Sequence, residues 1–113
     1  MKTRTEKDVK RECMRTLELL KRTGKILWYT RMQSGAVRVG EGKSSRYMKF
    51  CPTGTPDCLV IDKNGKNVWV EFKAPKGKLS KEQVDFRLMV ETCTDSRYLI
   101  VQTAFELHRQ LGS

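Results

Sequence analysis

The 113-residue sequence contains very little of what a zinc site needs. His108 is the only histidine, and no two cysteines have the two-to-four-residue spacing of a zinc knuckle. Zinc hydrolysis and a cysteine–histidine nucleophile are therefore excluded as leading ideas. We interpret three of the four cysteines as small buried apolar side chains: Cys13, Cys58 and Cys93.

Long apolar runs are also missing. A membrane-spanning helix needs about 20 apolar residues, and no segment approaches that length. The first residues, Met1-Lys2-Thr3-Arg4, are polar, whereas a secretory signal requires an apolar stretch there. We expect one domain spanning residues 1–113, located in the cytoplasm and without a membrane partner.

Positive charge is abundant and unevenly distributed. The chain carries 23 basic and 13 acidic residues, a net charge of +10. Residues 1–49 hold 14 basic and five acidic side chains, whereas residues 50–113 hold nine and eight. Such a one-sided field favours a polyanionic partner, of which nucleic acid is the commonest, although a basic half can also serve solubility alone.

Two helices are predicted from their capping residues. Thr5 followed by Asp8 is a capping pattern, and Val9, Cys13, Leu17 and Leu20 then recur at helical spacing up to a stop at Gly24. Ser80 caps a second helix over about 81–91, in which we expect Val84, Leu88 and Met89 to face inward. A short third helix is expected at 104–111.

Strands are expected at 26–31, 58–62, 67–73 and 98–101. Lys63-Asn64-Gly65-Lys66 contains an Asn-Gly turn signal and joins the middle two into a hairpin. Residues 33–50 are glycine-rich and basic, and we expect a long loop with room for a short strand around 37–39. The order α-β-β-β-α-β, with strands apolar on both faces, predicts an α/β fold with a small sheet flanked by helices.

The hairpin brings two acids together. Asp57 and Glu71 are symmetric about position 64, the middle of the turn, so they should face each other on paired strands. Two opposed carboxylates repel unless a cation lies between them, and carboxylate oxygens are ligands that Mg²⁺ prefers. Lys73 shares a strand face with Glu71 and would point at the phosphate that the metal holds. Taken alone, each part has a plainer interpretation: Glu-x-Lys is common on exposed strands, and an aspartate after proline is common in turns.

A third acid could join this pair. Glu6 lies within about 60° of the apolar stripe of the first helix, so we expect it to face inward and to supply a further carboxylate. The alternative is that Glu6 only complements the helix dipole in the first turn. A metal, two or three carboxylates and a lysine together are typical of phosphodiester cleavage.

Five short segments in order extend over nearly the whole chain: Thr5-Glu6 with Val9, Trp28 with Arg31 and Ser34-Gly35, Gly54-Thr55-Pro56-Asp57, Glu71-Phe72-Lys73, and Gly77-Lys78-Leu79-Ser80 with Gln83. In these segments the chain resembles a stand-alone virus-type replication-repair nuclease domain. That family is a branch of the Asp…Glu-x-Lys superfamily with a restriction-endonuclease-like core, related to archaeal Holliday-junction resolvases. Met32 departs from the pattern, since the family often has a polar residue there.

The resemblance implies roles at the matching positions. Asp57, Glu71 and the Phe72 carbonyl would bind Mg²⁺, for which Mn²⁺ can substitute, with Glu6 as a further ligand, direct or through water. Lys73 would be catalytic. Gln83 would sit beside the site, touching water or phosphate, although Ser80 to Gln83 is equally a capping box. Ser34 would contact a phosphate or serve as a plain turn residue.

The resulting expectation is a Mg²⁺-dependent DNA endonuclease that hydrolyses branched or otherwise structured DNA as a homodimer. The resemblance suggests a phage source, and with it the host cytoplasm, since stand-alone copies are common in phages. The alternatives are a non-catalytic nucleic-acid-binding protein with the same fold and a structural or protein-interaction role. Basic residues expected to contact the DNA backbone are Arg31, Arg38, Lys43, Arg46, Lys76 and Lys78.

Overall fold

The fold is mixed α/β. The computed structural model of the chain describes residues 4–33 and 36–112. Within these residues it has three α-helices, namely α1 (Glu6–Arg22), α2 (Lys81–Cys93) and α3 (Ala104–Leu111). None of the helices in the described ranges is long and apolar enough to cross a bilayer.

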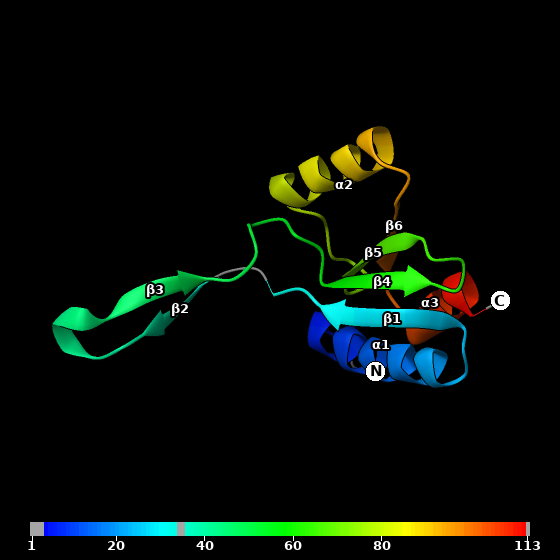
Figure 1. The fold of residues 1–113 in the computed structure, drawn as a ribbon, viewed down its shortest axis with the longest axis horizontal. Coiled ribbons are helices and arrows are strands. Elements are labelled where there is room, and N and C mark those ends of the chain that lie inside the picture. The colour runs from blue at the N-terminus through cyan, green and yellow to red at the C-terminus, as the bar shows by residue number, and fades with distance from the viewer. Residues whose placement is uncertain (1–3, 34–35, 113) are drawn as a thin grey trace.

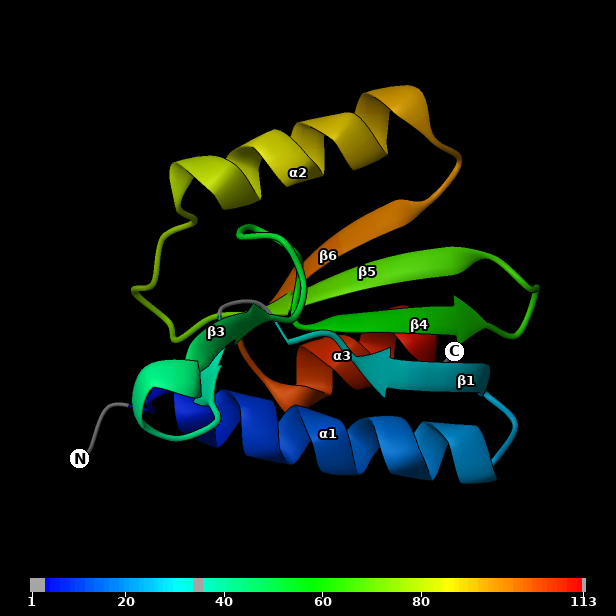
Figure 2. The same ribbon diagram turned by 60° about the vertical axis from the view of Figure 1, so that its left-hand side comes forward.

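A four-stranded mixed sheet forms the centre. Its strands are β1 (Ile26–Arg31), β4 (Cys58–Asp62), β5 (Asn67–Phe72) and β6 (Arg97–Val101), in the order β1-β4-β5-β6. Only β5 and β6 run parallel; the other neighbours are antiparallel. Helices α1 and α3 cover one face of the sheet, and α2 lies on the other (Figures 1 and 2). The strand predictions are confirmed to within about a residue.

The core lies between the sheet and α1 with α3. The stripe of Val9, Cys13, Leu17 and Leu20 is buried, as its helical spacing predicted. It packs against alternate residues of β4 and β5, among them Val68 and Val70, which lie on the inner face of the pleat. Helix α1 begins at a capping box between Thr5 and Asp8, an arrangement that typically contributes about 1 kcal/mol.

The segment 36–50 is more ordered than the long loop we expected, although the short strand expected around 37–39 is confirmed. It folds into a second, two-stranded sheet of β2 (Ala36–Val39) and β3 (Arg46–Lys49), joined through a short 3₁₀ turn at Gly42–Ser44. Figure 1 shows this hairpin projecting from the rest of the molecule. The hairpin was not predicted because this segment has few apolar residues, and only Val37 to Val39 show the alternation typical of a strand.

The prediction for the inward face of α2 is wrong. Val84, Leu88 and Met89 are exposed, and the side that meets the sheet carries Phe86 and Val90 instead. Phe86 packs edge to face on Trp69 of β5, with ring centroids 5.0 Å apart. Cys93, predicted to be buried, is exposed as well and ends the helix two residues later than expected.

A close backbone contact ties α2 to the segment before β4. Gly54 has a φ of +94°, and a Cβ there would lie 2.6 Å from the backbone oxygen of Glu82. Only glycine fits this approach, since any side chain would meet the first turn of α2. Gly54 thereby fixes the start of α2 beside the strand that follows Asp57.

We predict that Gly54→Ala destabilises the protein by more than Gly65→Ala. Gly65, in the hairpin turn, has a similar φ of +80°, but a methyl group there would have no atom within 4 Å. Gly65→Ala should cost about 1 kcal/mol of unfolding free energy, and the added clash at Gly54 should cost about 1–3 kcal/mol more. Urea unfolding measures both; equal losses would contradict the close packing of α2 on Gly54.

Candidate active site

The register of the β4–β5 hairpin sets up the site. Cys58 pairs with Val70 and Leu59 with Trp69, so one further step along the same register places Asp57 opposite Glu71. The two acids therefore face each other, as the turn spacing predicted. They lie at the end of the sheet where the N-terminal ends of α1 and α2 also lie (Figure 1).

Backbone hydrogen bonds lock this pair in place. The Asp57 N–H donates to Glu71 Oε2 at 3.2 Å, and the Phe72 N–H donates to Asp57 Oδ2 at 2.8 Å. The Asp57 carbonyl accepts from the Met32 N–H at 2.7 Å, which continues the pairing with β1. Each carboxylate is thus oriented in part by a backbone N–H group of the paired strand.

Lys73 completes the site from the end of β5. Its N–H donates to the Val101 carbonyl at 3.0 Å, extending the β5–β6 pairing by one residue. Its ammonium lies 3.7 Å from Glu71 Oε1 and 3.5 Å from Glu6 Oε1, and its side chain is 12% exposed. The lysine is therefore held at the centre of the acids rather than in solvent.

Glu6 reaches the site but does not face inward as predicted. Its side chain is 49% exposed and lies at the rim, in contact with Lys73. The helical angle put it close to the apolar stripe of α1, but in the first turn of the helix its side chain is half exposed. The prediction was therefore wrong about the burial of Glu6, but its carboxylate still lies next to Lys73.

Lys10 is a site residue that the sequence interpretation missed. Its ammonium lies 3.6 Å from Asp57 Oδ1, and both side chains are partly buried. Lys10 follows Glu6 by four residues, so both lie on the same side of α1. This four-residue spacing from Glu6 is the feature of the sequence that could have identified Lys10. The site thus holds three acids and two cations, Lys10 and Lys73, and has a net charge of −1 when all five are ionised.

Gln83 links α2 to the site. Its Nε2 donates to Glu71 Oε1 at 2.6 Å, while its own Oε1 accepts from the Ser80 N–H at 2.8 Å. The capping box of Ser80 and Gln83 is confirmed, and the same Gln83 side chain contacts Glu71, whereas its contact with water or phosphate stays a prediction. Because the amide is fixed at both ends, it holds Glu71 in a single orientation.

Burial changes the titration of Glu71, which is 2% exposed. Burial and then the nearby Asp57 charge raise the pKa of Glu71 to about 7, against a lowering by Lys73. A raised pKa means that the folded protein favours the protonated acid. The contribution of Glu71 to stability is therefore fully present below about pH 4.5 and is lost as the pH rises through about 7.

The donor set fits a divalent cation of the Mg²⁺ type. Mg²⁺ commonly takes only one or two protein carboxylates and completes its shell with waters and substrate oxygens. Asp57 and Glu71 supply two such carboxylates on rigid backbone. Within residues 4–33 and 36–112 no group of three His, Cys, Asp or Glu side chains is arranged to hold a metal ion, and the carboxylate of Glu6 contacts Lys73.

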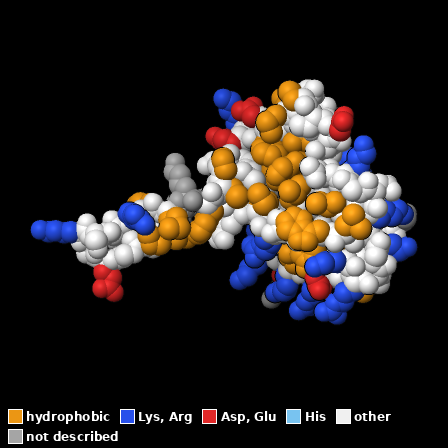
Figure 3. Space-filling model, in the orientation of Figure 1, with side chains coloured by type: hydrophobic (Ala, Val, Ile, Leu, Met, Phe, Trp, Pro, Cys, Tyr) orange, Lys and Arg blue, Asp and Glu red, His pale blue; other side chains and the backbone are white. Residues whose placement is uncertain are grey.

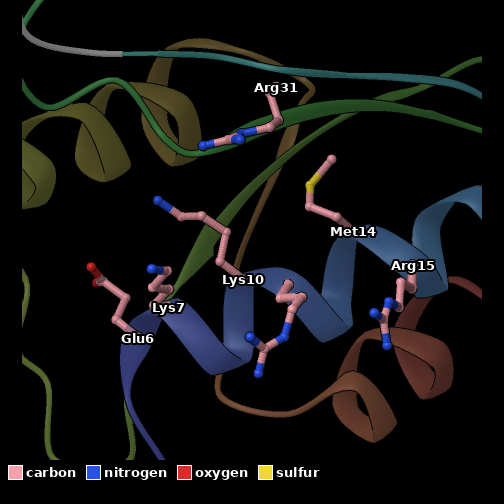
Figure 4. Close-up of a pocket in the computed structure, with 7 residues that line it drawn as sticks. Glu6, Lys7, Lys10, Met14, Arg15 and Arg31 are labelled. Carbon is pink, nitrogen blue, oxygen red and sulfur yellow. The ribbon is translucent and has the colours of Figure 1, made fainter.

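The predicted DNA contacts fall in three places. Arg31 ends β1 beside a cleft along α1 (Figure 4), and Lys76 and Lys78 lie between β5 and α2. Three lie on the projecting hairpin: Arg38, Lys43 and Arg46. Ser34 is outside the described residues.

Comparison with protein-family models, with curated proteins and with solved structures gave no match. The nuclease resemblance consequently remains a hypothesis that rests on this chain's own residues.

We predict that Asp57→Asn lowers the pKa of Glu71. The substitution removes the negative charge that, after burial, does most to raise that pKa. Carbon-13 NMR of the Glu71 carboxyl over a pH titration measures the change. Asp95→Asn, which removes an exposed charge, is the control and should leave the Glu71 titration where it is. A Glu71 midpoint that does not move in Asp57→Asn would contradict the described proximity.

Proposed function

We propose that the protein is a metal-dependent DNA endonuclease of the restriction-endonuclease-like superfamily, close to the virus-type replication-repair nucleases. One observation carries the proposal: a buried carboxylate and a second carboxylate are fixed face to face, with a lysine 3.7 Å from the first. Burying like charges together is costly unless a cation offsets them. Such an arrangement of two carboxylates and a lysine is typical of sites that hold a cation against a phosphodiester.

Asp57, Glu71 and the Phe72 carbonyl would hold Mg²⁺, with Glu6 able to contribute through water. When bound, the ion would polarise the phosphate and lower the pKa of a water molecule. The protein's own residues supply the orientation of the site. Asp57 and Glu71 keep their orientation through the backbone N–H groups of the paired strands, so no reorganisation is needed as charge develops.

Lys73 is the residue we assign to charge neutralisation. Its ammonium is anchored between Glu6 and Glu71 and has little exposure, so its charge acts on the site with little screening by solvent. A cation held there can orient the attacking water or stabilise the negative charge that builds on the phosphate. Gln83 acts through Glu71, and we assign it a positioning role.

The excess of 14 basic over five acidic residues in positions 1–49 supports nucleic acid as the substrate. We propose structured DNA, such as a four-way junction, as the preferred form. The alternative is a nucleic-acid-binding protein without catalysis. The observation in favour of that alternative is that the ion pairs of Lys10 and Lys73 with the acids balance the carboxylates without a metal.

We predict that labelled four-way-junction, flap or duplex DNA is cleaved with Mg²⁺ or Mn²⁺ and not with EDTA. Asp57→Asn and Lys73→Ala should each slow cleavage by at least about 100-fold, since each removes charge from the reacting centre. Lys66→Ala, an exposed lysine in the distant hairpin turn, is the matched control. Full cleavage by Asp57→Asn would refute the site, and DNA binding without any cleavage would favour the alternative.

We also propose that the protein acts as a homodimer. Val84, Leu88 and Met89 form an apolar side of α2 that is 40–55% exposed, where the sequence pattern predicted contact. Figure 3 shows hydrophobic side chains gathered over α2 and the neighbouring strands. An apolar helix face of this kind supports association with a second copy, which would set two sites on a symmetric junction.

Light scattering tests this arrangement. The expected mass is twice that of the 13.1 kDa chain, and the double variant Leu88→Glu with Met89→Glu should return it to that of one chain. Phe105→Glu, which places a negative charge on an exposed apolar residue of α3, should leave the dimer intact. A mass of one chain for the unmodified protein, with and without DNA, would contradict the dimer.

A further inference from the structure

A basic cleft runs along α1 next to the candidate active site. It has a volume of about 630 Å³ and lies between the first half of α1 and the end of β1. Five of its lining residues are cationic: Lys7, Lys10, Arg11, Arg15 and Arg31. Figure 4 shows Lys10 and Arg31 extending into this region from α1 and β1, and Figure 3 shows basic side chains along the edge of the molecule where α1 lies.

Helical spacing explains why these cations gather. Lys7, Arg11 and Arg15 follow each other at intervals of four residues, so they form one stripe on α1. From Lys7 to Arg15 the helix rises by about 12 Å. Arg31 comes from the opposite wall. The same helix therefore presents an apolar stripe to the core and a basic stripe to the cleft.

Most of this charge is not neutralised by the protein. Arg11 pairs with Asp8, and Lys10 faces Asp57. Among the residues that the structure describes, Lys7, Arg15 and Arg31 make no ion pair. Like charges in one concave surface repel each other, so the cleft gains free energy from a polyanion that fills it.

We propose that this cleft binds the phosphodiester backbone of one nucleic-acid strand and leads that strand to the Asp57–Glu71 pair. The choice of nucleic acid rests on the proposed function. Lys10 makes the connection, since it lines the cleft and lies 3.6 Å from Asp57 Oδ1. A flat membrane surface cannot enter a concave site of this size, whereas a strand of a few nucleotides can.

The strand has two possible sources, a single-stranded arm or one strand of a duplex. Both offer the same phosphate chemistry, and fluorescence anisotropy with a labelled 12-nucleotide single strand and with the matching duplex distinguishes them. The full-length chain is used in EDTA, so that binding is measured apart from cleavage.

The test variant is Lys7→Glu with Arg15→Glu, neither of which we place in the catalytic machinery. Its Kd should rise at least tenfold, and for the single strand the slope of log Kd against log salt should fall by about 1.4, the value for two lost phosphate contacts. The control is Lys21→Glu with Lys66→Glu, which changes the net charge equally at exposed positions away from the cleft and should alter Kd less than threefold.

A milder pair, Lys7→Ala with Arg15→Ala, guards against a folding defect in the charge-reversal variant and should show the same trend. Loss confined to the single strand identifies a single-stranded arm, and loss on both probes identifies a strand of a duplex. Equal binding by the cleft and control variants would overturn the inference.

Failure of this inference is separable from failure of the proposed function. If the cleft variants bind and cleave DNA like the control, the cleft assignment alone is wrong. If the unmodified chain binds through the cleft but never cleaves with Mg²⁺ or Mn²⁺, the endonuclease proposal is wrong and the cleft stands. If the unmodified chain binds neither probe and cleaves no junction, flap or duplex DNA with Mg²⁺ or Mn²⁺, both fail.

Discussion

The pairing of β4 with β5 is the constraint on which the candidate site depends. The hairpin turn centred on Asn64 fixes which residues of the two strands face each other. A shift of the strand register by one residue would turn the Glu71 side chain away from Asp57. The pair of backbone hydrogen bonds, from Asp57 to Glu71 and from Phe72 to Asp57, then holds both carboxylates close. The neighbouring strands β1 and β6 brace this hairpin on both sides, through Met32 and Lys73.

This geometry has an energetic cost, and the surrounding residues show how the fold offsets it. Glu71 is buried beside another acid, and its raised pKa records the resulting penalty. Lys10, Lys73 and Gln83 each place a donor or a positive charge against the pair. The close approach of Gly54 to the first turn of α2 brings Gln83 within reach of Glu71. Packing beside the carboxylates thus supports their orientation, as a preorganised site requires.

The sequence predicted well wherever local chemistry decides the structure. Caps at Thr5 and Ser80, the Asn-Gly turn and the apolar stripe of α1 are short-range signals, and they located the main elements and the opposition of Asp57 and Glu71. Such short-range signals do not determine which side of a helix packs against the sheet. The direction of α2 depends on Phe86 meeting Trp69, so Leu88 and Met89 could not be assigned to solvent from periodicity alone.

The basic cleft and Lys10 were missed for a related reason. A charge count shows an excess in the first half, but only the fold brings the stripe on α1 against Arg31 and next to Asp57. Likewise, the hairpin of β2 and β3 depends on pairing between residues that carry few apolar side chains. The roles of the site residues in catalysis stay predictions.

The most direct test of the central claim is a crystal structure of the protein soaked in Mn²⁺ and recorded at an energy where manganese scatters anomalously. The account predicts one anomalous peak bonded to carboxylate oxygens of both Asp57 and Glu71, at about 2.0–2.2 Å, the range for ions of this kind. Strong manganese peaks elsewhere, with Asp57 and Glu71 still bonded only to protein donors, would contradict it.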